Sequence, residues 1–167
     1  MTIREAQPDD AEQIIAHVQR LANEPDTTIP LAPGEFQVTV EQERRLLSGY
    51  LEADNSIFLV AEIDGQIIGV LNCDGGKRQA NRHAASTGMS VAKEWRNKGV
   101  GTALKLYLIE WAKGTGIIKR LEAEIYAHNA PNIHLHQKLG FVEEGRRRNA
   151  YFQHGRFIDS IIMTRLL

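Results

Sequence analysis

The residues Arg96-Asn97-Lys98-Gly99-Val100-Gly101-Thr102 lie between a strand-like run that ends at Val91 and a long amphipathic segment that begins near Gly99. A helix that begins at such glycines leaves its first four N–H groups without intrahelical partners and carries partial positive charge there. Glycine also lets the backbone approach a ligand closely. The stretch therefore predicts an anion site of the kind that holds a pyrophosphate, rather than an ordinary glycine-containing helix start.

Two common nucleotide-binding motifs do not fit this spacing. A P-loop needs four residues between its first Gly and a Gly-Lys-Ser/Thr, and a dinucleotide fingerprint needs a third Gly or Ala three positions after the second. Here the residues that follow Gly101 are Thr102, Ala103 and Leu104. The site is therefore expected to hold a different nucleotide.

Two motifs together resemble one enzyme family. The spacing Arg96-x-x-Gly99-x-Gly101 resembles the acetyl-coenzyme A pyrophosphate loop of the GCN5-related N-acetyltransferase (GNAT) superfamily. The stretch from Asn129 to Phe141 resembles that superfamily's next motif, an Asn followed by a helix that ends in Leu-Gly-Phe. Their order and separation agree with the family. The resemblance covers the chain from Ser86 to Leu167, and the N-terminal half matches only in its general pattern of helices and strands.

Hydrophobic periodicity predicts the elements around these motifs. Strands are expected over 2–6, 56–63, 66–74, 84–91, 121–126, 141–148 and 157–166, and helices over 11–21, 39–51, 99–113 and 131–139. The three strands from 56 to 91 form an antiparallel meander, and residues 84–126 form a parallel strand-helix-strand unit. The fold class is therefore α/β (α+β), a GNAT-like mixed, mostly antiparallel sheet flanked by helices, in one domain over residues 1–167.

Two helices are expected to press apolar faces against this sheet. In the helix over 39–51 the face is Leu46, Leu47 and Tyr50. In the helix over 99–113 it is Val100, Ala103, Leu104, Tyr107, Leu108, Trp111 and Ala112. The loop from Pro25 to Phe36 is rich in helix breakers and is expected to help select the substrate.

Composition limits the classes of partner. Twenty basic and twenty-one acidic residues give a net charge of −1, so no overall field favours nucleic acid or an anionic membrane. The chain has no long apolar run and no signal-peptide pattern, so a cytoplasmic location is expected. Cys73 is the only cysteine and is expected to be a buried, inert thiol. The histidines show no metal-ligand spacing, so no metal is expected.

The resemblance implies acetyl-coenzyme A as co-substrate and a set of residues that hold it. The backbone of the strand over 84–91 pairs with the pantetheine arm, the glycine stretch cradles the pyrophosphate, and Arg96 and Lys98 add positive charge. Asn129 is expected to contact the cofactor, to cap its helix, or to do both. The donor-binding residues are expected to be Met89, Ser90, Val91, Arg96, Asn97, Lys98, Gly99, Val100, Gly101, Thr102, Asn129, Asn132 and Lys138.

Two residues are candidate proton handlers. His136 stands where the family usually has a Tyr whose hydroxyl protonates the departing thiolate, and on a helical wheel it points into the apolar side. It is either a general acid or a structural histidine. Glu124 precedes Asn129 by five residues, the offset of a catalytic glutamate in some family members that acetylate protein N-termini. Glu124 is either the base that takes a proton from the amine, directly or through a water, or a plain charged or hydrogen-bonded strand residue. Glu122 shares its face of the strand, so a further alternative is that the two carboxylates only attract a cationic amine.

The resemblance therefore implies an N-acetyltransferase that transfers acetyl directly to a primary amine of a small molecule such as an amino acid. One alternative acceptor is a protein N-terminus, for instance of a ribosomal protein, and an alternative of another class is a non-catalytic acyl-coenzyme A sensor. The run Arg146-Arg147-Arg148 suggests a carboxylate or RNA site, but alternate strand residues face opposite sides, so it is not one patch. A solvated edge or a subunit contact is the alternative. A homodimer is expected by analogy alone.

Overall fold

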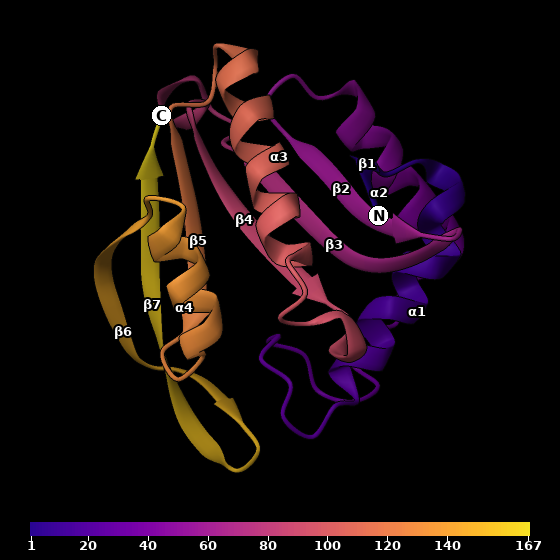
Figure 1. The fold of residues 1–167 in the computed structure, drawn as a ribbon, viewed down its shortest axis with the longest axis vertical. Coiled ribbons are helices and arrows are strands. Elements are labelled where there is room, and N and C mark those ends of the chain that lie inside the picture. The colour runs from indigo at the N-terminus through magenta and orange to yellow at the C-terminus, as the bar shows by residue number, and fades with distance from the viewer.

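The computed structural model describes residues 1–167 and has a single mixed sheet with strand order β1-β2-β3-β4-β5-β7-β6 (Figure 1). Only β4 and β5 run parallel, and every other neighbouring pair is antiparallel. The strands are β1 (Thr2–Glu5), β2 (Ile57–Ile63), β3 (Gln66–Gly75), β4 (Ala84–Val91), β5 (Arg120–Tyr126), β6 (Val142–Gln153) and β7 (Arg156–Leu166). The expected fold class is confirmed.

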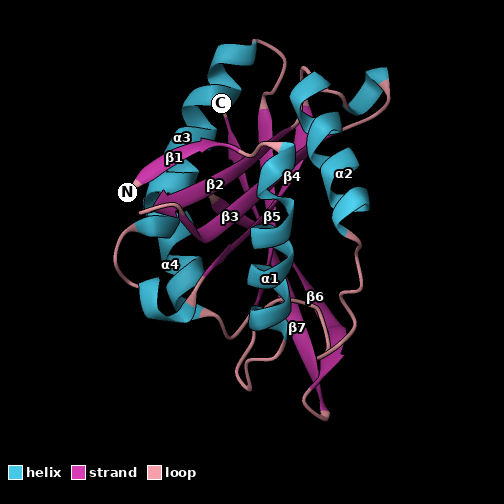
Figure 2. Cartoon of the chain, turned by 90° about the vertical axis from the view of Figure 1, so that its right-hand side faces the viewer, coloured by secondary structure: helices cyan, strands magenta, loops and turns pink.

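Helices cover both faces of the sheet (Figure 2). α1 (Ala11–Ala22) and α2 (Val40–Glu52) lie on one face, and α3 (Val100–Thr115) and α4 (Ala130–Lys138) lie on the other. Thr39 caps α2 in a capping box with Gln42, as its side chain accepts from the Gln42 N–H. No helix is long and apolar enough to cross a membrane.

The core lies mainly between the sheet and α3. This cluster holds nineteen buried residues, whereas the cluster under α1 and α2 holds eight. The smaller cluster covers β2 and β3 only, because its strand residues are Phe58, Val60, Ile67 and Val70. The α1/α2 face of β5, β6 and β7 is therefore left without a covering helix.

Three details of the expected elements were wrong. Leu46 is 48% exposed, because the buried stripe of α2 runs through Glu43, Leu47 and Tyr50. Tyr107 is 38% exposed, and the buried stripe of α3 instead includes Lys105. β6 runs to Gln153 rather than Arg148, because a bulge lets the strand resume pairing with β7 after Arg147.

Candidate active site

The parallel strands β4 and β5 separate halfway along their length. Ala84 to Thr87 pair with Arg120 to Ala123, and beyond that point β4 pairs only with β3 and β5 only with β7. The backbone groups of β4 that face the gap, from Gly88 to Val91, have no strand partner. They can pair with an extended ligand, and the contact of Met89, Ser90 and Val91 with a donor arm stays a prediction.

The start of α3 opens toward this gap. Asn97 and Gly99 have left-handed φ values of 59° and 85°, which turn the chain into the helix. The first intrahelical bond runs from the Ala103 N–H to the Gly99 carbonyl at 3.0 Å, so the N–H groups of Val100, Gly101 and Thr102 are left for a ligand. No acidic residue lies in this first turn. The geometry suits an anion.

Gly101 is required by packing as well. A Cβ at this position would lie 3.2 Å from the side chains of both Met89 and Leu135. The glycine therefore lets α3 approach β4 and α4 closely.

The two basic side chains of the stretch already have partners. Arg96 donates through Nε to the Val91 carbonyl at 3.0 Å and through Nη2 to Glu24 at 2.6 Å. The Lys98 ammonium stands 5.1 Å from the centre of the Trp95 ring. Arg96 thus ties the end of α1 to the end of β4, and its contact with a pyrophosphate stays a prediction.

The start of α4 borders the same gap. Asn129 caps α4, since its Oδ1 accepts from the Asn132 N–H at 3.3 Å, and its Nδ2 donates to Thr28 Oγ1 at 3.1 Å. Asn132 Oδ1 is buried without a hydrogen-bond partner. Lys138 is exposed at the other end of α4, so the structure does not bring it together with Asn129.

His136 points into the core, as the helical wheel predicted. The side chain is 2% exposed, its Nδ1 lies 2.9 Å from the Asn132 carbonyl, and its ring meets Phe141 edge to face at 4.8 Å. A carbonyl only accepts, so Nδ1 carries the proton and the neutral ring has a bare Nε2, which has no partner. Burial, together with the Lys105 charge, lowers the pKa of His136 to about 4.

Lys105 is a residue that the sequence reasoning missed. It is 1% exposed, and its ammonium donates to Thr87 Oγ1 at 2.7 Å and stands 5.6 Å from the centre of the Phe141 ring. Burial lowers the pKa of Lys105 to about 7. Thr87 is the last β4 residue paired with β5, so this buried amine lies where the two strands separate. Lys105 is three residues before Leu108 on α3, and this helical spacing could have revealed that its side chain lies on the buried side.

His17 was also missed. It is fully buried on α1, and its Nε2 lies 3.0 Å from Ser90 Oγ on β4. Burial lowers the pKa of His17 to about 4, with a smaller contribution from Arg20. Its spacing from Ile14 and Leu21 matches the buried face of α1, which could have revealed it.

The carboxylates of β5 lie on the α1/α2 face of the sheet, opposite Lys105 and His136. Glu122 and Glu124 share this face of β5, as expected, and Glu124 is the first residue beyond the paired segment. Both oxygens of Glu124 lie 2.8 Å from Arg147 Nη1, and Oε1 also accepts from Ser160 Oγ at 2.5 Å. Glu122 is held by Arg120 at 3.0 Å.

A second polar network, also missed, lies across the gap. Tyr50 donates to Asp74 Oδ1 at 2.5 Å, and Asn72 donates to Asp74 Oδ2 at 2.6 Å. A Cβ at Gly88 would lie 2.5 Å from Asn72 Oδ1, so glycine is needed there. Burial and Asp74 raise the pKa of Tyr50 above its usual range.

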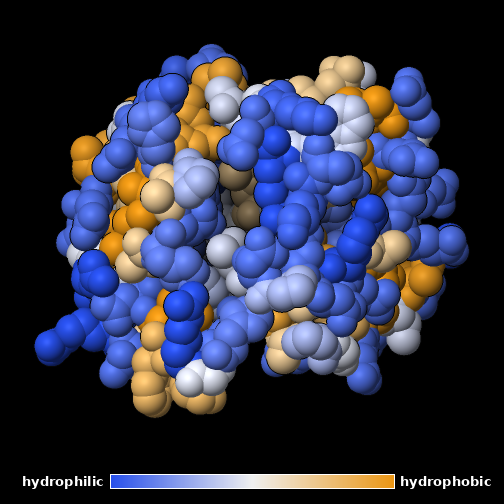
Figure 3. Space-filling model, turned by 60° about the horizontal axis from the view of Figure 1, so that its bottom comes forward, coloured by the Kyte–Doolittle hydropathy of each residue, from blue (hydrophilic) through white to orange (hydrophobic).

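The loop between α1 and α2 reaches over the open end of the gap. Gln153 Nε2 donates to the carbonyls of Ile29 and Leu31 at 3.1 Å, and Gln153 Oε1 accepts from the Tyr126 hydroxyl at 2.9 Å. Seen from this end, the surface is hollowed at its centre (Figure 3). The loop is therefore held against β6 through Gln153, and its part in substrate selection stays a prediction.

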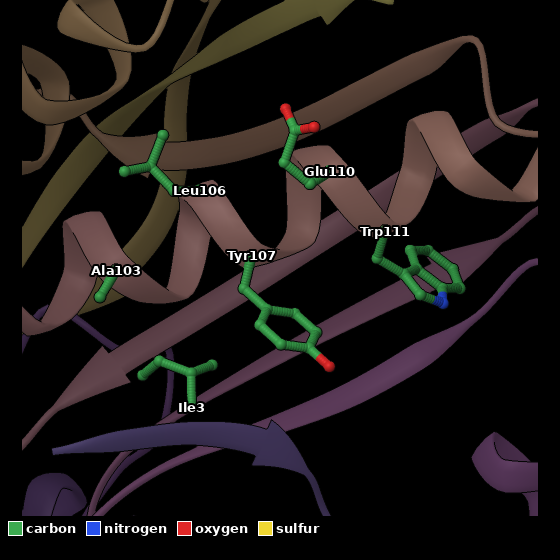
Figure 4. A pocket seen from close by; sticks show the side chains of 6 residues that line it. All are labelled: Ile3, Ala103, Leu106, Tyr107, Glu110 and Trp111. Carbon is green, nitrogen blue, oxygen red and sulfur yellow. The ribbon is translucent and has the colours of Figure 1, made fainter.

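A different hollow, of about 570 Å³, opens between β1 and α3 (Figure 4). Five of its six lining residues are apolar, and they include Ile3, Leu106 and Trp111. It also holds the Glu110 carboxylate and the Tyr107 hydroxyl, and it lies beside β1 rather than at the gap between β4 and β5, so it is not the candidate site.

The side chains of metal-ligating types do not cluster, and the single thiol is buried. No group of three or more His, Cys, Asp and Glu side chains is arranged to hold a metal ion. Cys73 is buried as expected, and burial raises the pKa of its thiol to about 12.

Comparison with known proteins agrees with this geometry. The model of the acetyltransferase (GNAT) family matches residues 18–141. An L-amino acid N-acetyltransferase of Escherichia coli is 34% identical over 108 residues, which are 65% of this chain and 67% of that protein. A GNAT-family acetyltransferase structure from Streptococcus pneumoniae is 33% identical with a TM-score of 0.94 over 99% of this chain and 98% of that chain.

Two other similar solved structures carry names that mention a protein acceptor or the cofactor. A ribosomal-protein-alanine N-acetyltransferase from Brucella melitensis is 29% identical with a TM-score of 0.87 over the whole of both chains. A structure from Salmonella typhimurium that contains its cofactor acetyl-CoA is 23% identical, with a TM-score of 0.86 over 99% of this chain and 93% of that chain. The latter likeness shows the fold alone.

Proposed function

Because the chain belongs to the acetyltransferase (GNAT) family and is an N-acetyltransferase, we propose that it transfers acetyl from acetyl-coenzyme A to the primary amine of a small molecule such as an amino acid. The observation that carries this proposal is the gap between β4 and β5. It has free helix N–H groups and free strand backbone on one side, and carboxylates on the other.

The donor side fits coenzyme A. The N–H groups at the start of α3 suit a pyrophosphate, and the unpaired edge of β4 from Gly88 to Val91 suits the amides of a pantetheine arm. When bound, the donor supplies a thioester, whose acetyl group is open to attack by an amine. Asn129 lies at the same end of the gap and is a further candidate contact.

The acceptor side fits a cationic amine that must become neutral before it attacks. The amine nitrogen forms a bond to the acetyl carbon, the carbon–sulfur bond breaks, and the sulfur leaves as a thiolate. Glu124 is the proposed acceptor of the amine's proton, directly or through a water, because it lies beside the point where the strands separate.

The thiolate then needs a proton, and His136 remains the candidate donor. Its geometry sets a condition, since the neutral ring carries its proton on Nδ1 and presents a bare Nε2. A proton must therefore reach Nε2 first. Lys105 packs on the same Phe141 ring, but its pKa of about 7 lies above the pKa of about 4 of His136, so the lysine holds its proton more strongly and Nε2 must take its proton from another source.

The test is release of coenzyme A thiol from acetyl-coenzyme A in the presence of amino acids, polyamines or short peptides, with the acetylated product identified by mass. We expect release with amino acids, at a rate that rises with acceptor concentration. Release with peptides alone would favour the protein N-terminal acetyltransferase. Donor binding without release for any acceptor would contradict the proposal and favour an acyl-coenzyme A sensor.

A further inference from the structure

The ion pair between Glu124 and Arg147 is pre-formed on the open face of the gap. Arg147 Nη1 lies 2.8 Å from both oxygens of Glu124, and Ser160 holds Oε1 from the neighbouring strand. A negative and a positive group are thus fixed next to each other, just beyond the last β5 residue that pairs with β4.

Arg147 has unused hydrogen-bonding capacity. Only its Nη1 donates a hydrogen bond, and Nε and Nη2 have no partner. Arg120, on the same face, differs because its guanidinium is shared among Glu122, Glu144 and Thr164. The guanidinium fork can hold a carboxylate through two parallel bonds, so the free edge of Arg147 is able to bind a second one.

A bulge in β6 aims these side chains at the gap. Arg147 pairs with Ser160 and Tyr151 pairs with Ile158, so β6 has two extra residues between these pairs, where Asn149 adopts a left-handed φ of 51°. Bulges of this kind redirect side chains and are frequent next to active sites. Here Arg147 and Tyr151 stay on the face of Glu124, and the Tyr126 and Tyr151 rings lie 5.0 Å apart beside it.

We propose that Glu124 and Arg147 together recognise the zwitterion of a free α-amino acid. The acceptor's ammonium binds Glu124, and its carboxylate, one carbon away, binds the Nε and Nη2 edge of Arg147. This inference rests on the proposed function and narrows its acceptor. A polyamine or a peptide N-terminus lacks the carboxylate next to the amine and leaves Arg147 without a partner.

The charges favour the exchange of contacts within the Glu124–Arg147 ion pair for contacts with the ammonium and the carboxylate of the amino acid. The ion pair is partly solvated, since the Arg147 side chain is 58% exposed, and such pairs are weak. A zwitterion adds no net charge to the site and gives each member of the pair a new partner. Acceptors with only a positive charge would have to compete with Arg147 for Glu124.

The test compares L-α-amino acids with their carboxamides as acceptors. We expect the wild type to have a KM at least tenfold lower for the acid than for its amide. In Arg147→Gln, the KM for the acid should rise at least tenfold and approach that for the amide. Arg147→Lys should recover part of the preference, because it restores the charge but not the planar fork.

Arg146→Gln is the matched control. Arg146 is 56% exposed and pairs with Asp159 at 2.8 Å, but it lies on the opposite face of β6. The Arg146→Gln variant should therefore keep the wild-type preference for the acid over its amide. Equal KM values for acid and amide in the wild type, or an unchanged preference in Arg147→Gln, would overturn this inference while the acetyltransferase activity stood. Failure to acetylate any amine would overturn the proposed function as well.

Discussion

The two faces of the sheet differ most at the point where β4 and β5 separate. On the α3/α4 face, Lys105 and His136 are buried against Phe141, and burial lowers the pKa of both. On the α1/α2 face, Glu124 and Arg147 are open to solvent and pair with each other. The same pair of strands thus has buried groups whose charged forms are disfavoured on one side, and exposed charges on the other.

From this difference we expect the two faces to control different properties of the protein, stability on the α3/α4 face and acceptor choice on the α1/α2 face. On the α3/α4 face ionisable groups are enclosed by the larger core, so substitutions there should change stability and its pH dependence. Over β5, β6 and β7 the α1/α2 face has no covering helix, so substitutions of the exposed Arg147 there should change acceptor choice with little effect on stability. Three predictions test this division, from the largest expected effect to the smallest.

The largest effect is expected at the start of α3. Gly99→Glu places a carboxylate beside the free N–H groups at a position with φ of 85°. Repulsion of the pyrophosphate should weaken binding of acetyl-coenzyme A by a hundredfold or more, about 3 kcal/mol. Calorimetric titration measures this.

Gly116→Glu is the control for the first prediction. Gly116 ends the same helix and has a left-handed φ of 66°, and a Cβ added there would meet no atom within 4 Å, as at Gly99. The backbone strain in Gly116→Glu is therefore similar to that in Gly99→Glu, but the new carboxylate lies at the C-terminal end of α3, away from the free N–H groups. Equal donor affinity in the two variants would contradict an anion site at Gly99.

The second prediction concerns acid stability. His17 and His136 have folded-state pKa values of about 4, below the usual value near 6.5, so the unfolded chain binds more protons between these limits. The free energy of unfolding should fall as the pH drops from about 6.5 to about 4, by on the order of 3 kcal/mol per histidine.

Urea unfolding of the wild type and His136→Phe across this range measures the second prediction. The variant should lose about half of the pH dependence, and the rest should disappear when His17→Phe is added. An unchanged slope in the double variant would show that other groups cause it.

The third and smallest effect is expected at Lys105. Its folded-state pKa of about 7 lies below the ordinary value near 10.5, so stability should rise as the pH increases between these values. Lys105→Met removes the buried amine and should stabilise the fold at pH 7 by roughly 1 to 3 kcal/mol. Thr87 keeps its bond to the Glu122 carbonyl.

Unfolding at pH 7 and pH 9.5 checks the third prediction. The stability of Lys105→Met should be nearly equal at the two values, whereas that of the wild type should increase. A variant that is less stable than the wild type at pH 7 would mean that the amine contributes more through Thr87 than its burial costs.

Much of the fold could be predicted because its signals are local. The left-handed Asp64 and Gly65 between β2 and β3, the Thr39 cap of α2 and the glycine at the start of α3 each act within a few residues. Leu46 and Tyr107 were misplaced because their helices are apolar over more than one stripe, and only packing decides which stripe is buried.

The candidate site was predictable only in part. The glycine start of α3 and the inward direction of His136 on α4 each follow from spacing within one segment of the chain. The burial of Lys105 and the contact of Arg147 with Glu124 do not, because each joins elements that are distant in sequence.

The sequence by itself determined the order of strands and helices, the glycine loop and the shared face of Glu122 and Glu124. These depend on backbone preferences and on the period of each element. Only the tertiary structure decided where β4 leaves β5, which carboxylate pairs with Arg147 and how deeply Lys105 is buried. These depend on register between strands and on packing of α3, which join groups that the chain itself keeps far apart.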